Sequence, residues 1–166
     1  MRRMIVFVTI SFLVGLGVGY FARSAAIGTP HGTDAHAADL AAIERLEQED
    51  IEVTLSQDPK GLVDVWAEDG VRIMPGNPPT VGKVAIAAEN EKAHVEHPEF
   101  KVLKYAPDIK NFQIAIADGW AIEVGSVVAT YRLSAKDNPV SINDQGMRVL
   151  KRQSDGSWKF ALVGLR

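Results

Sequence analysis

Residues 112–133 read FQIAIADGWAIEVGSVVATYRL, and this pattern points to the architecture of the whole chain. Apolar and β-branched residues fill two runs on either side of Asp118-Gly119, which is typical of a tight β-hairpin turn. Three further stretches after Pro98 have the same strand-like composition: residues 100–105, 147–152 and 158–165. The second half of the chain is therefore predicted to form an antiparallel sheet.

Helical patterns come before these strands. Asp39 is placed to cap a first helix, and the charged positions of that helix, Glu47 among them, are assigned to solvent. Its apolar positions are Leu40, Ile43, Leu46, Ile51 and Leu55. Residues 59–66 predict a second, short helix, a turn follows at Asp69-Gly70, residues 71–74 predict a short strand, and residues 82–95 predict a third helix.

Helices followed by strands predict an α+β fold. We expect N-terminal helices packed on a curved mixed or antiparallel sheet, as in a cone-shaped α+β barrel with a central hollow.

The N-terminal region predicts export. An uncharged apolar run, residues 4–22, follows Arg2 and Arg3 and is long enough to cross ~30 Å of hydrocarbon. We therefore assign residues 1–23 to a membrane anchor or signal segment, residues 24–38 to a flexible linker and residues 39–166 to the folded domain. Ser24-Ala25-Ala26 leaves cleavage open, but the length of the run and Arg23 favour an uncleaved anchor. The domain is then expected outside the cytoplasm, on the periplasmic side, or secreted if the leader is removed.

Composition excludes several kinds of chemistry. The chain has no cysteine, so it has neither disulfides nor thiolate ligands. Its 18 Lys and Arg residues against 21 Asp and Glu residues argue against a nucleic-acid partner, which requires a basic surface. No cofactor and no metal are expected, because the three-residue spacing of His94 and His97 does not by itself make a metal site.

Several local strings occur in an order and spacing that resemble a known group of proteins. They are residues 55–71 (LSQDPKGLVDVWAEDGV), Met74-Pro75 with Pro79 and Gly82, residues 120–125 (WAIEVG) and residues 153–158 (QSDGSW). From about Leu40 to Leu165 the chain resembles the SnoaL-like, ketosteroid-isomerase-like group of the nuclear transport factor superfamily. The resemblance implies a cone-shaped fold. It does not choose among the isomerases, cyclases, dehydratases, hydrolases and oligomerising modules that share that fold.

Glu123 is the main candidate for chemistry, because it interrupts an apolar strand and lies in the WAIEVG string, where relatives also tend to carry an acid. Residues alternate between the two faces of a strand, so Glu123 shares a face with Ala121, Gly125, Val127 and Tyr131. If that face points into the hollow, burial raises the pKa of Glu123 toward a value useful for proton transfer. If the bulkier alternate face points inward, Glu123 lies in solvent or in a surface ion pair.

Other residues are candidates for contact with a ligand in the hollow. Tyr131 offers a hydroxyl group, and Arg148 can hold an acidic group or pair with Glu123. The apolar candidates are Trp66, Met74, Met147 and Trp158, for which the alternative is an ordinary core position. The last strand carries Leu162 and Val163 where relatives often carry a polar residue, so no partner base for Glu123 is visible, and this counts against catalysis.

Three functions remain open. The first is a domain that binds a small apolar or amphipathic molecule in the cavity and forms a homodimer through its exposed sheet face. The second is an isomerase-, cyclase- or hydrolase-type enzyme in which Glu123 is the general acid or base and Tyr131 or Arg148 stabilises charge. The third is a dimeric structural module whose hollow is filled by side chains.

Overall fold

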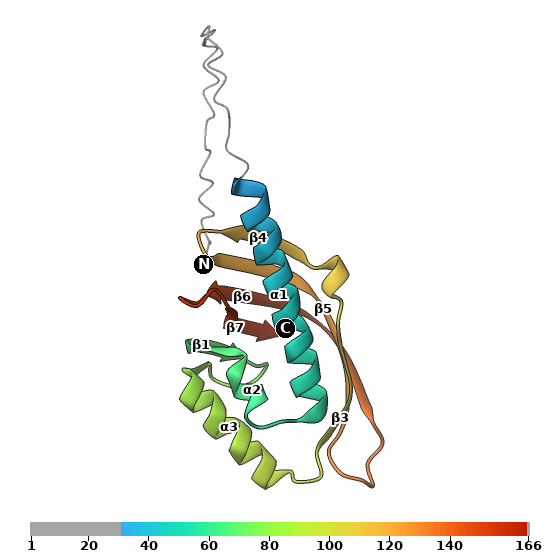
Figure 1. The fold of residues 1–166 in the computed structure, drawn as a ribbon. Helices are drawn as coiled ribbons and strands as arrows, with labels where there is room; N and C mark the ends of the chain where they lie inside the picture. The colour runs from blue at the N-terminus through green and yellow to red at the C-terminus, as the bar shows by residue number, and fades with distance from the viewer. Residues whose placement is uncertain (1–30, 166) are drawn as a thin grey trace, which may run out of the picture.

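The computed structural model describes residues 31–165, which form three α-helices, one 3-10 turn and seven strands (Figure 1). The helices are α1 His31–Ser56, α2 Gly61–Asp64 and α3 Lys83–Glu96, and the 3-10 turn is η1 Ile109–Asn111. The strands are β1 Trp66–Ile73, β2 Thr80–Val81, β3 Lys101–Pro107, β4 Gln113–Ala117, β5 Trp120–Arg132, β6 Val140–Arg152 and β7 Trp158–Leu165.

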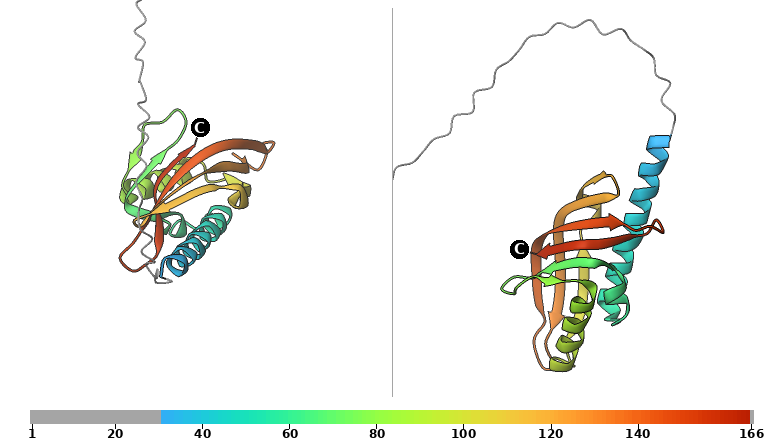
Figure 2. Two further views of the ribbon diagram at one scale, coloured as in Figure 1. Left: turned by 90° about the horizontal axis from the view of Figure 1, so that it is seen from above. Right: turned by 90° about the vertical axis from the view of Figure 1, so that its left-hand side faces the viewer.

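All seven strands belong to one mixed sheet. Its order is β2-β1-β7-β6-β5-β3, and β4 pairs with the first half of β5. The pair β1 and β7 is parallel and the other pairs are antiparallel. The sheet curves around α1, while α3 packs beside β1 (Figure 2). The predicted α+β fold is therefore confirmed, as an open cone whose sheet does not close into a barrel.

The long hairpin of β5 and β6 is the centre of the sheet. At the entry to β5, Asp118 and Gly119 have φ angles of 50° and 77°, as a tight hairpin turn requires, so the predicted turn is confirmed. Strand β6 begins at Val140 and not at Met147, because residues 141–145, which are polar apart from Ile142, continue the pairing with β5. Both strands are 13 residues long, and this length lets them bend over α1.

The start of the domain differs from the prediction. Helix α1 begins at His31, so residues 31–38 of the predicted linker are helical and Asp39 lies inside the helix, not at its cap. The Asp39 carboxylate instead accepts a hydrogen bond from the Trp158 indole at 3.3 Å. The predicted membrane segment, residues 4–22, lies outside the described residues. Within residues 31–165, the structure has no helix with both the length and the apolar character to cross a membrane.

Strand β1 also differs from the prediction. Trp66 begins this strand and is not part of a helix, and Asp69-Gly70 lies within the strand, not at a chain reversal. The register between β1 and β7 shifts between Trp66 and Val71, which marks a bulge. A Cβ on Gly70 would lie 3.0 Å from the Ala67 carbonyl oxygen, so the bulge favours glycine there. Strand β2, which pairs with the end of β1, was not predicted.

The core lies between α1, the inner face of the sheet and α3. Its buried apolar members are Ile43, Leu46, Val53, Val65, Trp66, Ile86, Ala121, Leu150, Trp158 and Phe160. The buried stripe of α1 contains Ile43 and Leu46 as predicted, but Leu55 is exposed and Glu47 is completely buried. The assignment of Glu47 to solvent was therefore wrong.

Candidate functional site

Along the first half of β5, buried and exposed residues alternate, so the two faces of the sheet differ sharply there. Ala121, Glu123 and Val127 are buried, with exposed fractions of 0%, 3% and 7%. The intervening Trp120 and Ile122 are 45% and 47% exposed. The sequence left the direction of this strand open, and the structure turns the Glu123 face inward, toward α1.

Arg148 lies at the centre of a buried charged cluster. It is the cross-strand partner of Glu123 in the β5–β6 ladder, and its Nε lies 3.4 Å from Glu123 Oε2. Helix α1 supplies two more carboxylates: Arg148 Nη2 lies 2.6 Å from Glu47 Oε2, and Nη1 lies 3.7 Å from Asp50 Oδ2. Three acidic groups therefore surround one guanidinium group inside the domain.

Tyr105 connects strand β3 to this cluster. Its hydroxyl donates a hydrogen bond of 2.8 Å to Asp50 Oδ2. Burial raises the pKa of Tyr105, and the neighbouring Asp50 carboxylate raises it further, so the hydroxyl keeps its proton. We define the charged cluster as Glu47, Asp50, Tyr105, Glu123 and Arg148.

Burial also favours the neutral forms of the three acids. It raises the pKa of Glu47 to about 8, against the opposing attraction of Arg148, and it raises the pKa of Asp50 and of Glu123 as well. Within the described residues, both Glu47 oxygens and Glu123 Oε2 make no hydrogen bond of good geometry, although Arg148 lies within ion-pair distance of both side chains. A proton on Glu47, shared with Glu123, would supply one donor between the two carboxyl groups and would remove their charge repulsion.

A small cavity of about 60 Å³ opens beside the charged cluster. Its polar wall is formed by Tyr105, Glu123 and Arg148, and its other lining residues are Phe112, Gly125, Val127, Gly146 and Val163. Pockets for drug-sized ligands have volumes of roughly 300–1,000 Å³, whereas a water molecule needs about 10–15 Å³ of such space. In the present conformation the cavity therefore accommodates only a group of a few atoms.

Among the seven residues proposed from the sequence, Glu123 and Arg148 line this cavity and contact each other. Tyr131 is half-buried and packs on Phe100 with ring centroids 5.7 Å apart, away from the cavity lining. The remaining four candidates do not line the cavity either. Trp66 and Trp158 are core residues, Met74 is exposed after β1, and Met147 is exposed because it alternates with Arg148 along β6.

Sequence reasoning missed four residues of the site: Glu47, Asp50, Tyr105 and Phe112. A signal for two of them was present, because Glu47 and Asp50 follow Ile43 by four and seven residues and so share its helical face. The charge of Glu47 directed its assignment to solvent, and Asp50 was not assigned. Tyr105 and Phe112 carry no such signal, because each is positioned by a long-range strand pairing with β5 or by the turn η1.

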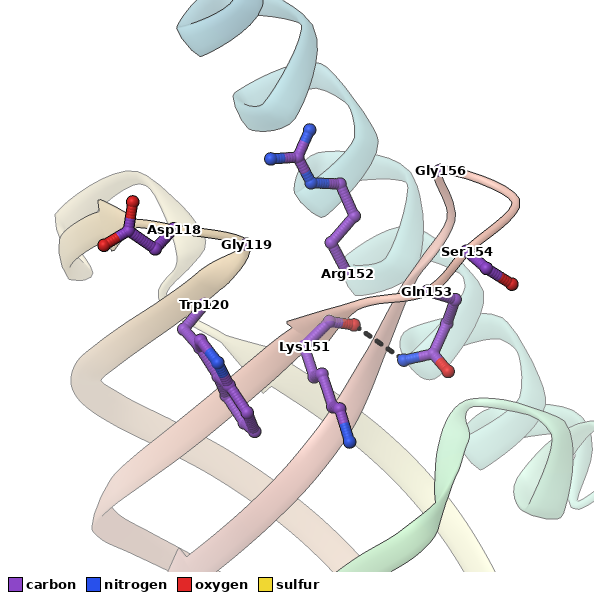
Figure 3. A pocket seen from close by; sticks show the side chains of 8 residues that line it. All are labelled: Asp118, Gly119, Trp120, Lys151, Arg152, Gln153, Ser154 and Gly156. Atoms are coloured by element: carbon purple, nitrogen blue, oxygen red, sulfur yellow. Dashed lines mark hydrogen bonds between the residues drawn. The ribbon is translucent and has the colours of Figure 1, made fainter.

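A larger depression lies at the start of β5, between the turns that precede β5 and β7 (Figure 3). Its volume is about 470 Å³, and it is lined by Asp118, Gly119, Trp120, Lys151, Arg152, Gln153, Ser154 and Gly156. It is open to solvent, and its two cations already have partners: Lys151 pairs with Asp69 at 3.0 Å and Arg152 pairs with Asp39 at 3.4 Å. We therefore place the candidate site at the smaller, enclosed cavity.

Neither the charged cluster nor any other part of residues 31–165 brings together three or more His, Asp or Glu side chains in a metal-binding arrangement. In the charged cluster the reason is physical. The Arg148 guanidinium group occupies the position between the acids that a cation would take.

The α+β cone of this chain is found in many solved structures. A protein from Catenulispora acidiphila has a TM-score of 0.68 and 18% identity, over 80% of this chain and 93% of its own. A C. acidiphila structure in complex with S-DNPA has a TM-score of 0.65 and 19% identity, over 78% of this chain and 92% of its own. A hexachlorocyclohexane dehydrochlorinase (LinA) of type 2 has a TM-score of 0.69 and 17% identity, over 81% of this chain and 88% of its own.

These likenesses establish the fold. The chain shares the α+β cone fold of these solved structures, which is the fold that its resemblance to SnoaL-like proteins implied. No family model matches the sequence. No curated protein matches it either.

Proposed function

We propose that this domain binds a small amphipathic molecule in the cavity beside Glu123 and Arg148. The observation that carries the proposal is that a buried charged cluster forms one wall of a cavity whose other lining is apolar. Removing charged groups from water costs several kcal/mol for each ion, and a core that serves stability alone avoids this cost. Strongly perturbed acids in a concave site are instead typical of functional sites.

The lining indicates which chemistry the ligand carries. Glu123 and Arg148 offer a hydrogen-bond acceptor and a donor to a hydroxyl or carbonyl group. Val127, Val163 and Phe112 offer contacts to an apolar part. A protein of the same fold from C. acidiphila was solved with the small molecule S-DNPA, which supports ligand binding by such a cone.

The test is native mass spectrometry of the full chain purified from the cells that make it. We expect a retained small molecule in the wild-type protein and its loss in Glu123→Gln, which removes the charge but keeps the shape. Met147→Leu, on the outer face of the adjacent strand, is the matched control and should retain the molecule. An empty wild-type protein, or equal retention in Glu123→Gln, would contradict the proposal.

A second candidate is an enzyme that transfers a proton. The observation that favours it is the Glu47–Glu123 pair, in which burial raises the pKa of both carboxyl groups and brings that of Glu47 to about 8. Glu123 lines the cavity and would exchange a proton with the substrate, while Glu47 and Arg148 balance the charge behind it. The hydroxyl near the reacting group is that of Tyr105, not of Tyr131.

The catalytic candidate is tested once the retained molecule is known. General acid–base catalysis contributes about 10²–10⁴-fold to a rate. Glu123→Gln should therefore lower kcat by about that factor, and Tyr131→Phe should leave kcat unchanged. Conversion of the molecule at an equal rate by both variants would exclude a proton-transfer role for Glu123.

We also propose that the domain is held outside the cytoplasm by residues 4–22 and pairs with a second copy through its outer sheet face. The support for the location is the uncharged run after Arg2 and Arg3, and the support for pairing is the exposed apolar surface of β5 and β6. A C-terminal fusion to alkaline phosphatase, which is active only outside the cytoplasm, tests the location. An inactive fusion that is present at normal levels would contradict it.

A further inference from the structure

Phe112 covers the cavity from the side of η1. Its ring lies over the Arg148 guanidinium group, 4.5 Å from it, and against Gly125 on β5. A Cβ placed on Gly125 would overlap Cδ1 and Cε1 of Phe112, so the ring lies directly on the strand backbone. This close approach is possible only because residue 125 is glycine.

The floor beneath the ring is a pair of glycines. Gly125 and Gly146 are direct partners in the β5–β6 ladder, and both line the cavity. Glycine inside a strand weakens the strand, and it often marks a place where a ligand or another group approaches the backbone closely. The two glycines therefore leave a flat slot between the sheet backbone and Arg148, and the Phe112 ring occupies part of it.

Phe112 is held less firmly by the backbone around it than the two glycines of the slot are. Gly125 and Gly146 lie within strands of 13 residues, whereas Phe112 is half-buried and follows the three-residue turn η1. Its backbone N–H bonds to the Ile109 carbonyl oxygen at 3.3 Å. Phe112 is thus the part of the cavity wall that can withdraw with the least disruption of the sheet.

We infer that Phe112 is a plug in a slot for one planar ring of the ligand, so that ligand entry displaces the Phe112 side chain. The inference rests on the proposed binding function and gives the ligand a chemical class: a single-ring aromatic compound with a hydroxyl group. Its ring stacks on the Arg148 guanidinium group where the Phe112 ring now lies, and its hydroxyl hydrogen-bonds to Glu123. Withdrawal of the plug enlarges the small cavity by the space of a phenyl group.

The probe is phenol, and cyclohexanol is its control, since it has the same hydroxyl on a non-planar ring of similar size. Both are titrated into the full-length wild type and into Phe112→Ala by calorimetry. Phe112→Ala should bind phenol at least ~10-fold more tightly than the wild type, because the plug no longer competes for the slot. It should bind cyclohexanol about five-fold or more weakly than phenol, because stacking on Arg148 is lost.

Two further variants test the geometry. Phe100→Ala removes a half-buried phenyl group that lies on Tyr131 outside the cavity, and it should not bind phenol more tightly than the wild type. Adding Gly125→Ala to Phe112→Ala puts a methyl group into the slot and should abolish the gain. If Phe112→Ala does not fold, Phe112→Leu keeps an apolar side chain without the planar ring and should show a smaller gain.

The plug is disproved if a folded Phe112 variant binds phenol no more tightly than the wild type, if Phe100→Ala gains equally, or if cyclohexanol binds as well as phenol. The failure of the plug differs from the failure of the proposed function. A retained ligand in the wild type with unchanged phenol affinity in Phe112→Ala removes the plug alone. An empty wild type together with no phenol binding by any variant removes both.

Discussion

The inner and outer faces of the β5–β6 hairpin each depart from an ordinary sheet at particular positions. The inner face carries Glu123 and Arg148, which are buried together with two acids from α1. The outer face carries Trp120, Ile122 and Met147, each 45–47% exposed. One charged pair therefore lies inside, among buried apolar residues such as Ala121 and Leu150, while large apolar side chains lie outside.

This difference teaches that the hairpin is not arranged for the stability of a lone domain. A sheet that served stability alone would place apolar residues inside and charged residues outside. The inner face instead suits a polar ligand, and the outer face suits another surface. The four predictions that follow measure how far the two faces differ, beginning with the largest effect.

Replacing Arg148 by Met should have the largest effect. The change leaves three acids buried without their shared cation, and breaking a buried ion pair in this way costs about 3–5 kcal/mol of unfolding free energy. Urea unfolding at pH 7 measures it. The matched control is Arg152→Met on the same strand, whose exposed pair with Asp39 contributes at most about 1 kcal/mol. Equal losses of unfolding free energy in the two variants would show that the buried arginine contributes no more to stability than the exposed one.

The pH dependence of stability should come from the inner face. Burial raises the pKa of Glu47 from 4.5 to about 8, so between these values the folded chain holds a proton that the unfolded chain releases. Stability is therefore highest below about pH 4.5 with respect to this group and falls as pH rises toward 8. The slope is at most about 1.4 kcal/mol per pH unit for one proton.

Glu47→Gln should flatten this slope, because the amide does not titrate. Unfolding free energies at pH 5, 6, 7 and 8 measure the difference between variant and wild type. The unfolding free energy of the variant relative to that of the wild type should increase steadily from pH 5 to pH 8. Parallel curves would show that Glu47 is ionised throughout the range in the folded chain.

Tyr105→Phe should have an intermediate effect. It deletes the hydrogen bond to Asp50 and leaves that carboxylate without its donor, at a cost of about 1–2 kcal/mol. The pKa of Asp50, which burial raises and this hydrogen bond lowers, should rise further, and NMR titration of the carboxyl carbon measures the change. Tyr131→Phe is the control. A larger loss of unfolding free energy in Tyr131→Phe than in Tyr105→Phe would contradict the assignment of Tyr105 to the charged cluster.

Ile122→Lys on the outer face should have the smallest effect on folding. An exposed position of this kind changes stability by at most about 0.5 kcal/mol. The same change puts a charge into the proposed contact between two copies, so light scattering should show a dimer for the wild type and a monomer for the variant. Leu103→Lys, an exposed change on strand β3, should stay dimeric. A monomeric wild type at high concentration would refute pairing through this face.

Local pattern was sufficient for much of the fold. The hairpin at Asp118-Gly119, the strands β4, β5 and β7, and helix α3 lie within one or two residues of their predicted positions, because a tight turn and alternating residues specify them locally. Local pattern failed at β1, where a bulge at Gly70 resembles a turn in sequence. It also failed at the start of α1, where Asp39 resembles a cap but bonds to Trp158, 119 residues away.

The sequence by itself determined the α+β class and the strand that carries Glu123. It also determined which residues of that strand share a face with Glu123. Only the tertiary structure decided which face turns inward, that Glu47 and Asp50 meet Arg148, and that Phe112 closes the cavity. The physical reason is that charge alone does not reveal burial. A carboxylate on a helix is placed in solvent by its own chemistry, and only a partner brought from a distant strand makes its burial tolerable.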